Sequence, residues 1–247
     1  MSSALASQCV ATLESPHVSA AAATLAEAFD YESPYSWSWP LGLPHDRFAF
    51  WLERMYLPER VAGCSALSCL LLAVSSNHGS TRAAEPKSLV VDGGASGVLT
   101  LEDMNAKADE SEDPQSPPGM AAIDGILAAC KAQFWEALRA HGCDNAGGPD
   151  TLGRFGYFAF LGVAVSARRR GVGAELVKRA CVELKDQGYV YGVAFCTSHV
   201  SAALFAAQGF QRWGRVHYHR FAMPDGSRPF ATLPDDECAV MVRDLRA

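Results

Sequence analysis

The sequence has 247 residues, 49% of them hydrophobic, with a formal net charge of −6 and a pI near 5.6. A chain of this length can bury one substantial core, and we expect residues 1–247 to form a single domain. The acidic balance argues against a general nucleic-acid-binding protein, which would normally carry a basic face.

Neither a membrane segment nor a disulfide framework is predicted. The longest apolar stretch, residues 66–74, is too short to span a bilayer, and the first residues lack the basic segment of a secretory signal. The eight cysteines form no Cys-x-x-Cys pair and lie mostly in apolar segments, which is typical of reduced thiols. We therefore expect a cytoplasmic protein that binds no membrane, no nucleic acid and no metal.

In the first part of the chain, apolar periodicity predicts two helices and three strands. We expect a strand over residues 8–13 and a helix over 17–29, whose apolar side chains recur at helical spacing. A second helix is expected to end before Pro58, because the residue before a proline disfavours helical geometry. Residues 67–74 and 97–101 are expected to form two further strands, paired as a hairpin.

Several stretches interrupt this pattern. Residues 30–44 hold three prolines and a group of aromatic side chains. Residues 75–87 and 105–119 are dominated by Ser, Gly, Pro and acidic residues, and we expect both to be flexible surface insertions. A helix over 121–141 follows, with its apolar residues in register.

The second half of the chain alternates regularly between strands and helices. The expected strands are 155–165, 189–196, 213–221 and 238–242, and the expected helices are 173–187 and 199–208. Together the elements predict an α/β fold of the mixed α+β kind, with a central twisted mixed sheet flanked by helices.

The turn after the strand at 155–165 is the most informative stretch for function. Apolar residues recur at helical spacing after Gly173, so the backbone N–H groups of residues 169–174 lie at a helix start and point outward. These donors and the positive end of the helix dipole favour an anion such as a pyrophosphate. Gly171 and Gly173 permit close approach, and three arginines add positive charge. The alternative is a basic surface turn before an ordinary helix.

Arg168-x-x-Gly171-x-Gly173-Ala174, preceded by Leu161-x-Val163, resembles the acyl-CoA-binding signature of the GNAT N-acetyltransferase family. The resemblance implies a GNAT-like fold and acetyl-CoA as cosubstrate, with its pyrophosphate on the turn and its pantetheine arm along the backbone of the preceding strand. The residues that it implies for acetyl-CoA binding are Leu161, Val163, Val165, Arg168, Arg169, Arg170, Gly171, Val172, Gly173, Ala174 and Phe205.

A narrower resemblance points to the acceptor. Thr197-Ser-His-Val-Ser-Ala202, followed by Gly209-Phe210, is similar to the insect-type arylalkylamine N-acetyltransferases. Phe29-x-x-Glu32-x-Pro34 matches the place where that subfamily keeps its catalytic glutamate. The resemblance therefore implies Glu32 as the general base that takes a proton from the amine. Asp30 is the nearest rival, and an exposed loop carboxylate is the alternative interpretation of Glu32.

Two serines and one phenylalanine on the short helix complete the catalytic hypothesis. Ser198 and Ser201 could relay a proton or hold the amine through their hydroxyls; alternatively, Ser198 caps the helix and Ser201 packs within it. Many family members carry a tyrosine as general acid where this chain has Phe205. No hydroxyl is available at that position to protonate the leaving thiolate.

The aromatic group after the first helix predicts an acceptor pocket. Tyr31, Tyr35 and Trp37 could supply apolar area and cation–π contact, or could instead pack under a loop. His217 is a further candidate for lining this pocket. Cys181 and Cys196 suggest an acyl-cysteine intermediate, but their apolar surroundings favour core thiols.

The hypothesis from sequence is an acetyl-CoA-dependent acyltransferase that acetylates a small primary amine, an arylalkylamine by preference, through direct attack in a ternary complex. Three alternatives remain: acetylation of a polyamine or amino sugar, acetylation of a protein amine, and a non-catalytic acyl-CoA-binding module. We expect a monomer or a weak dimer.

Overall fold

In the part of the chain that the structure describes, the fold is built on one seven-stranded mixed sheet. The computed structural model describes residues 8–12, 15–30, 45–58, 69–75, 97–106, 119–143, 147–234 and 236–246. The strands are β1 Gln8–Thr12, β2 Cys69–Ser75, β3 Gly97–Asp103, β4 Phe155–Val163, β5 Tyr191–Cys196, β6 Gln211–His217 and β7 Glu237–Asp244. Their order across the sheet is β1-β2-β3-β4-β5-β7-β6.

Only β4 and β5 run parallel; the other neighbouring strands are antiparallel. Parallel neighbours need a crossover, and the helix that follows β4 supplies it. The mixed sheet that the sequence predicted is therefore confirmed, as is the antiparallel pairing of β2 with β3. A β-bulge between Thr100 and Leu101 leaves Ala159 of β4 without an opposite residue on β3.

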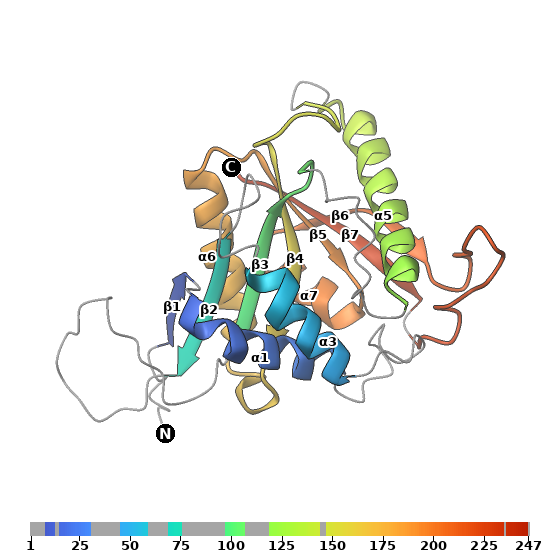
Figure 1. The fold of residues 1–247 in the computed structure, drawn as a ribbon. Coiled ribbons are helices and arrows are strands. Elements are labelled where there is room, and N and C mark those ends of the chain that lie inside the picture. The colour runs from blue at the N-terminus through green and yellow to red at the C-terminus, as the bar shows by residue number, and fades with distance from the viewer. Residues whose placement is uncertain are drawn as a thin grey trace.

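Helices cover both faces of the sheet (Figure 1). Their bounds are α1 Val18–Asp30, α3 His45–Trp51, α5 Met120–Ala140, α6 Val172–Asp186 and α7 His199–Ala207, with short turns η1 Ser15–His17, η2 Leu52–Tyr56 and η4 Val165–Ala167. Figure 1 shows α1 and α3 crossing one face of the sheet, and α5 lies on the same face at its β6 end. The helices α6 and α7 cover the opposite face.

Each face has its own apolar core. Leu176, Val177 and Leu184 of α6 pack onto one face of β3 and β4. On the other face, Phe134 of α5 and Leu25 of α1 are fully buried in two separate clusters. Because helices cover both faces, strands such as β3 and β5 bury side chains on both sides and are nearly continuous apolar runs in the sequence.

Most expected elements are present, with shifts at their ends. The strand expected to reach residue 165 ends at Val163, because Ala164 to Arg168 form a tight turn in which the N–H groups of Ala167 and Arg168 bond to carbonyls three residues back. The second helix continues into a π-helical turn, η2, which the sequence pattern did not distinguish from α-helix. Nearly all of the two expected insertions, 75–87 and 105–119, lies outside the described residues.

Candidate cofactor and acceptor site

The sheet is split where β4 and β5 end. The two strands pair only from Phe155 with Tyr191 to Phe158 with Ala194. Beyond that point β4 continues to Val163 paired only with β3, while β5 continues to Cys196 paired only with β7. The β4 edge that faces β5 is therefore unpaired over residues 159–163 within the described structure, and its N–H and C=O groups can pair with an extended ligand.

The turn between β4 and α6 has the backbone of an anion site. Arg169 has a φ of 59° and Gly171 a φ of 81°, so two of its residues adopt the left-handed conformation. Arg169 is the one non-glycine with such a φ in the part of the chain that the structure describes, and local strain of this kind is characteristic of binding sites. Gly171 is the N-cap of α6 and no side chain caps it, so the first N–H groups of this helix remain open to an anion.

The residues of the turn fit a pyrophosphate. Arg168, Arg169 and Arg170 are exposed, and a Cβ built on Gly171 would meet nothing within 4 Å. Gly173 is buried, and a Cβ there would lie 3.2 Å from Leu204 of α7, so this glycine allows α6 and α7 to approach each other. One expected cofactor contact is restricted: the side chain of Val172 is buried in the core, so only its backbone can contact a ligand at the turn.

Val165 does not pair as a strand residue, and this expectation is corrected. It lies in η4 after β4 has ended, and its side chain is exposed. Leu161 and Val163 are in β4 as expected, on its unpaired edge, with side chains packed against the α6 cluster. The Arg168 guanidinium donates through Nε to the carbonyl oxygen of Val163 at 3.3 Å, which ties the turn to the end of β4.

Ser198 and Ser201 form the capping box of α7. The backbone N–H of Ser201 donates to Ser198 Oγ, and the backbone N–H of Ser198 donates to Ser201 Oγ, each at 3.2 Å. Ser201 Oγ also donates to the Ser198 carbonyl at 2.9 Å. The structural interpretation of Ser198 as a helix cap is therefore confirmed. Any catalytic role of these hydroxyls has to be compatible with these bonds.

Phe205 lies in the core beneath α7, where 4% of its surface is exposed. Its ring packs edge-on against Phe158 and Phe210, with centroids 5.4 and 4.9 Å apart. Because Phe158 is the last β4 residue that pairs with β5, Phe205 supports the closed end of the split.

The predicted acceptor residues are described only in part. Glu32, Tyr31, Tyr35 and Trp37 lie outside the described residues, directly after α1 ends at Asp30. His217 lies at the end of β6, opposite Glu237 of β7, with its ring 5.5 Å from that of His219. Its Nδ1 atom is buried and finds no hydrogen-bond partner within the described structure.

A polar group that the sequence analysis missed lies beside the split, on the face that α1 and α5 share. Glu102 of β3 is directly opposite Tyr157 of β4. The Tyr56 hydroxyl, from η2, donates to the Glu102 carboxylate. Burial raises the pKa of Tyr157 well above its usual value, and the nearby Glu102 carboxylate raises it further. These residues are far apart in the sequence, so only the strand register brings them together.

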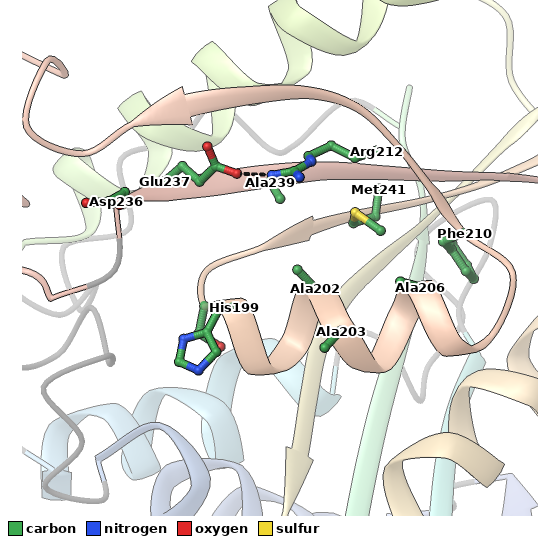
Figure 2. A pocket seen from close by; sticks show the side chains of 11 residues that line it. His199, Ala202, Ala203, Ala206, Phe210, Arg212, Asp236, Glu237, Ala239 and Met241 are labelled. Atoms are coloured by element: carbon green, nitrogen blue, oxygen red, sulfur yellow. Dashed lines mark hydrogen bonds and ion pairs between the residues drawn. The ribbon is translucent and has the colours of Figure 1, made fainter.

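A hollow of about 560 Å³ lies on the other side of α7, away from the α6 turn (Figure 2). Alanines of α7 and β7 form its floor, and Figure 2 shows the ion pair of Arg212 and Glu237 along its β6 wall. Of the two predicted catalytic residues that the structure describes, Ser198 and Ser201, Ser198 lines this hollow. Because α7 separates this hollow from the turn, it is distinct from the split between β4 and β5.

The buried cysteines are not suited to acyl transfer. Burial raises the pKa of Cys196 to about 12, and it also raises the pKa of Cys181. Both thiols therefore stay protonated at neutral pH, which disfavours the acyl-cysteine alternative. No group of three or more His, Cys, Asp or Glu side chains suited to a metal occurs among the residues that the structure describes.

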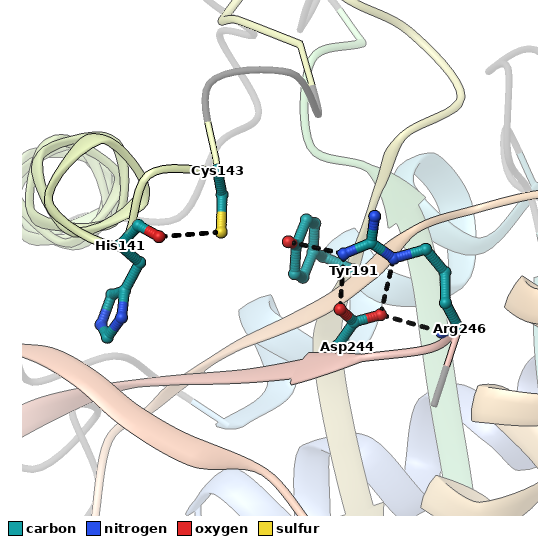
Figure 3. Close-up of polar contacts among 5 residues, drawn as sticks. All are labelled: His141, Cys143, Tyr191, Asp244 and Arg246. Atoms are coloured by element: carbon teal, nitrogen blue, oxygen red, sulfur yellow. Dashed lines mark hydrogen bonds and ion pairs between the residues drawn. The ribbon is translucent and has the colours of Figure 1, made fainter.

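A second polar cluster closes the opposite end of the sheet (Figure 3). Arg246 donates to the Tyr191 hydroxyl at 3.0 Å and to Asp244 at 2.5 Å, and its guanidinium lies 5.3 Å from the Tyr191 ring. Hydrogen bonds from Arg246 lower the pKa of Asp244. The cluster joins the start of β5 to the end of β7 and lies away from the split.

No helix in the described part of the chain is long and apolar enough to cross a membrane. A model of the acetyltransferase (GNAT) family matches residues 102–210, which contain β4, the turn, α6, β5 and α7. A comparison with curated protein sequences found no significant match.

Several solved structures share the fold. The C-terminal condensation domain of Ebony in complex with beta-alanyl-dopamine aligns with a TM-score of 0.70, arylalkylamine N-acetyltransferase 2 from Aedes aegypti with 0.66, and an agmatine N-acetyltransferase with 0.65. Each is 14% identical to this chain and is aligned over 96% of it; the aligned shares of the three structures are 99%, 99% and 100%.

Proposed function

We propose that this protein transfers the acetyl group of acetyl-CoA to a small primary amine, because a model of the acetyltransferase (GNAT) family matches residues 102–210 and the chain shares the fold of a solved N-acetyltransferase. An arylalkylamine is the preferred acceptor. The observation that carries the proposal is the position of the α6 turn at the open end of the unpaired β4 edge, next to the split in the sheet.

The donor side of the proposal rests on this turn and edge. N–H groups of residues 172–174 and the arginines would hold the pyrophosphate, since a helix N-terminus with left-handed residues before it favours anions. Those N–H and C=O groups of residues 159–163 that point away from β3 would pair with the amides of the pantetheine arm. An N–H at this edge would also stabilise the oxyanion that develops on the thioester carbonyl.

The chemistry needs a base, because an alkylamine with a pKa near ~10.4 is almost entirely protonated at neutral pH. Glu32 is the proposed acceptor of that proton. The neutral nitrogen then attacks the thioester carbon; the C–N bond forms, the C–S bond breaks and its electron pair leaves with sulfur. The second proton of the nitrogen neutralises the CoA thiolate. Phe205 contributes packing to this step and no proton.

Aromatic residues support an aromatic acceptor. Tyr31, Tyr35 and Trp37 follow α1, and the rings of Tyr157 and Phe195 lie 5.0 Å apart on the face that α1 shares. Two similar structures are named for acceptors of different kinds, an arylalkylamine and agmatine, so acceptor class needs a direct test.

Release of free thiol from acetyl-CoA provides that test, with phenethylamine, dopamine, agmatine, spermidine, glucosamine and an unblocked peptide as acceptors. We expect the highest kcat/KM with the two arylalkylamines. Turnover confined to agmatine or spermidine would show that the acceptor is an amine of that kind and not an arylalkylamine. Turnover confined to the peptide would show that the protein is a protein acetyltransferase. Measurable acetyl-CoA binding without turnover of any acceptor would contradict the proposed activity.

A further inference from the structure

The end of the split defines where the acetyl group would arrive, and this inference rests on the proposed function. The α6 turn lies beyond Val163, and the split closes at Phe158. An extended arm that follows β4 between these points passes five residue steps of about 3.3 Å, or roughly 16 Å. This distance suits an extended pantetheine arm, so its thioester would lie close to Phe158.

Glu102 and Tyr157 are the polar residues next to that point. Tyr157 precedes Phe158 in β4, and Glu102 is its direct cross-strand partner. The side chain of Tyr157 packs towards the α5 cluster, and Glu102 accepts from Tyr56 of η2, so both lie on the face opposite α6. Both side chains are partly exposed.

A chain of hydrogen bonds fixes the carboxylate. The backbone N–H of Phe160, next to the bulge, donates to Thr100 Oγ1 at 2.9 Å, and Thr100 Oγ1 lies 3.1 Å from the Tyr56 hydroxyl. Since the single proton of Tyr56 is donated to Glu102, the Thr100 hydroxyl is the donor to Tyr56. The hydrogen bonds therefore all point in one direction, from the β4 backbone at the split to the Glu102 carboxylate. Hydrogen bonds arranged in this way strengthen one another.

We propose that Glu102 binds the ammonium group of the acceptor amine and is a specificity-determining residue of this site. A carboxylate and an ammonium group form a charge-assisted hydrogen bond, which a neutral acceptor cannot replace. Tyr56 is the positioning residue for Glu102. In this arrangement Glu102 would hold the cation beside the thioester.

The surroundings of Glu102 define the rest of the ligand. Tyr157 remains a neutral phenol because its pKa is raised, and no hydrogen-bond partner for its hydroxyl occurs among the described residues. Its ring and that of Phe195 form an aromatic pair next to the carboxylate. The site is therefore suited to a primary ammonium group attached to an apolar or aromatic body.

Calorimetric binding of phenethylamine to the protein saturated with CoA tests the proposal without requiring turnover. Glu102→Gln should weaken phenethylamine binding about tenfold or more, whereas Glu102→Asp, which keeps the charge, should recover part of the loss. Tyr56→Phe should weaken binding by a smaller factor. Glu136→Gln, on the exposed face of α5, is the matched control and should bind as the wild type does.

CoA affinity, measured in the same variants, separates a specific effect from misfolding and should be unchanged. The proposal is overturned if Glu102→Gln binds phenethylamine as tightly as the wild type does. It is also overturned if that variant loses CoA and amine affinity equally, or if the wild type binds no amine. If Glu102→Gln does not fold, Tyr56→Phe decides: unchanged amine affinity in that variant overturns the role of this carboxylate. Amine binding that depends on Glu102 without thiol release would contradict the proposed transfer instead.

Discussion

Thr100 shows how one buried hydroxyl can shape the site. Its side chain is fully buried, accepts the Phe160 N–H beside the bulge and donates to Tyr56. A bulge changes the twist and direction of a strand, and here it lies where β4 leaves β5. The hydroxyl therefore satisfies a backbone donor that the bulge removes from the ladder.

Replacing Thr100 by Val should lower the free energy of unfolding by about 1–3 kcal/mol, because the part-buried Phe160 N–H and the Tyr56 hydroxyl both lose a partner. Urea unfolding measures this change. Thr100→Ser retains the hydroxyl and removes only the methyl group, so it should be the less destabilising of the two. Equal stability of Thr100→Val and the wild type would contradict the bonding scheme.

The thiols offer a prediction that depends on pH. Raised pKa values keep Cys196 and Cys181 protonated at neutral pH, and their deprotonation as the pH rises would leave a buried charge. Both residues should resist iodoacetamide at pH 7.5 in the folded protein, while the partly exposed Cys143 reacts. Peptide mass spectrometry measures this. Fast alkylation of Cys196, together with loss of activity in Cys196→Ala, would support an acyl-cysteine intermediate instead.

Glu32 is the proposed base, and its replacement tests that role separately from Glu102. Glu32→Ala should lower kcat by roughly 10²- to 10⁴-fold, the usual contribution of a general base. The affinity for acetyl-CoA should stay the same, and the remaining rate should rise with pH as more amine becomes neutral. Stopped-flow thiol release across pH 6–9 measures both effects. An unchanged kcat would place the base elsewhere.

At the scale of elements, the turn before α6 depends on glycine at its N-cap. Gly171 has a φ of 81°, which costs other residues about 1 kcal/mol or more, yet a Cβ there meets no atom. Glycine is therefore required by the backbone conformation and not by lack of space, and this conformation would direct the following N–H groups to the proposed pyrophosphate.

Gly171→Ala should weaken CoA binding several-fold, as alanine shifts the turn out of its left-handed conformation. Gly226 is a matched control, since it has a φ of 83° and equally open surroundings but lies in the loop before β7. Gly226→Ala should show similar backbone strain with unchanged CoA affinity. Calorimetry with CoA measures both variants. Equal affinities in the two would argue against the pyrophosphate position.

Elements with strong apolar periodicity were predictable from the sequence, and their junctions were less so. The helix α6 follows from apolar residues repeated every three to four positions, and the strand β5 follows from a short apolar segment. The end of β4 at Val163 does not, because Val165 is a strand-forming residue that the following turn overrides. Ser198 had two interpretations, and the capping box confirms the structural one.

The acceptor face was the part that local patterns could not predict. Glu102 and Tyr157 are 55 positions apart and meet only through the antiparallel register of β3 and β4. That register includes a bulge, which changes which side chains share a face, and nothing in the local sequence marks it. Long-range pairing therefore carries information that motifs and periodicity do not.

On the scale of the whole molecule, the sheet separates the proposed donor site from the proposed acceptor site. The turn and α6 lie on one face, whereas Glu102, Tyr56 and the end of α1 lie on the other. The split between β4 and β5 connects them. A donor and an acceptor that approach from opposite faces can meet there in a ternary complex, and proximity of this kind can supply a large part of the rate enhancement.

The central claim is that this chain joins an acetyl group from acetyl-CoA to an amine nitrogen. Mass spectrometry of a reaction with acetyl-CoA and phenethylamine tests it most directly. We expect N-acetylphenethylamine and free CoA in equal amounts, with no acetylated protein intermediate. Release of CoA without the N-acetylated amine, or accumulation of acetyl-protein before the product, would contradict it.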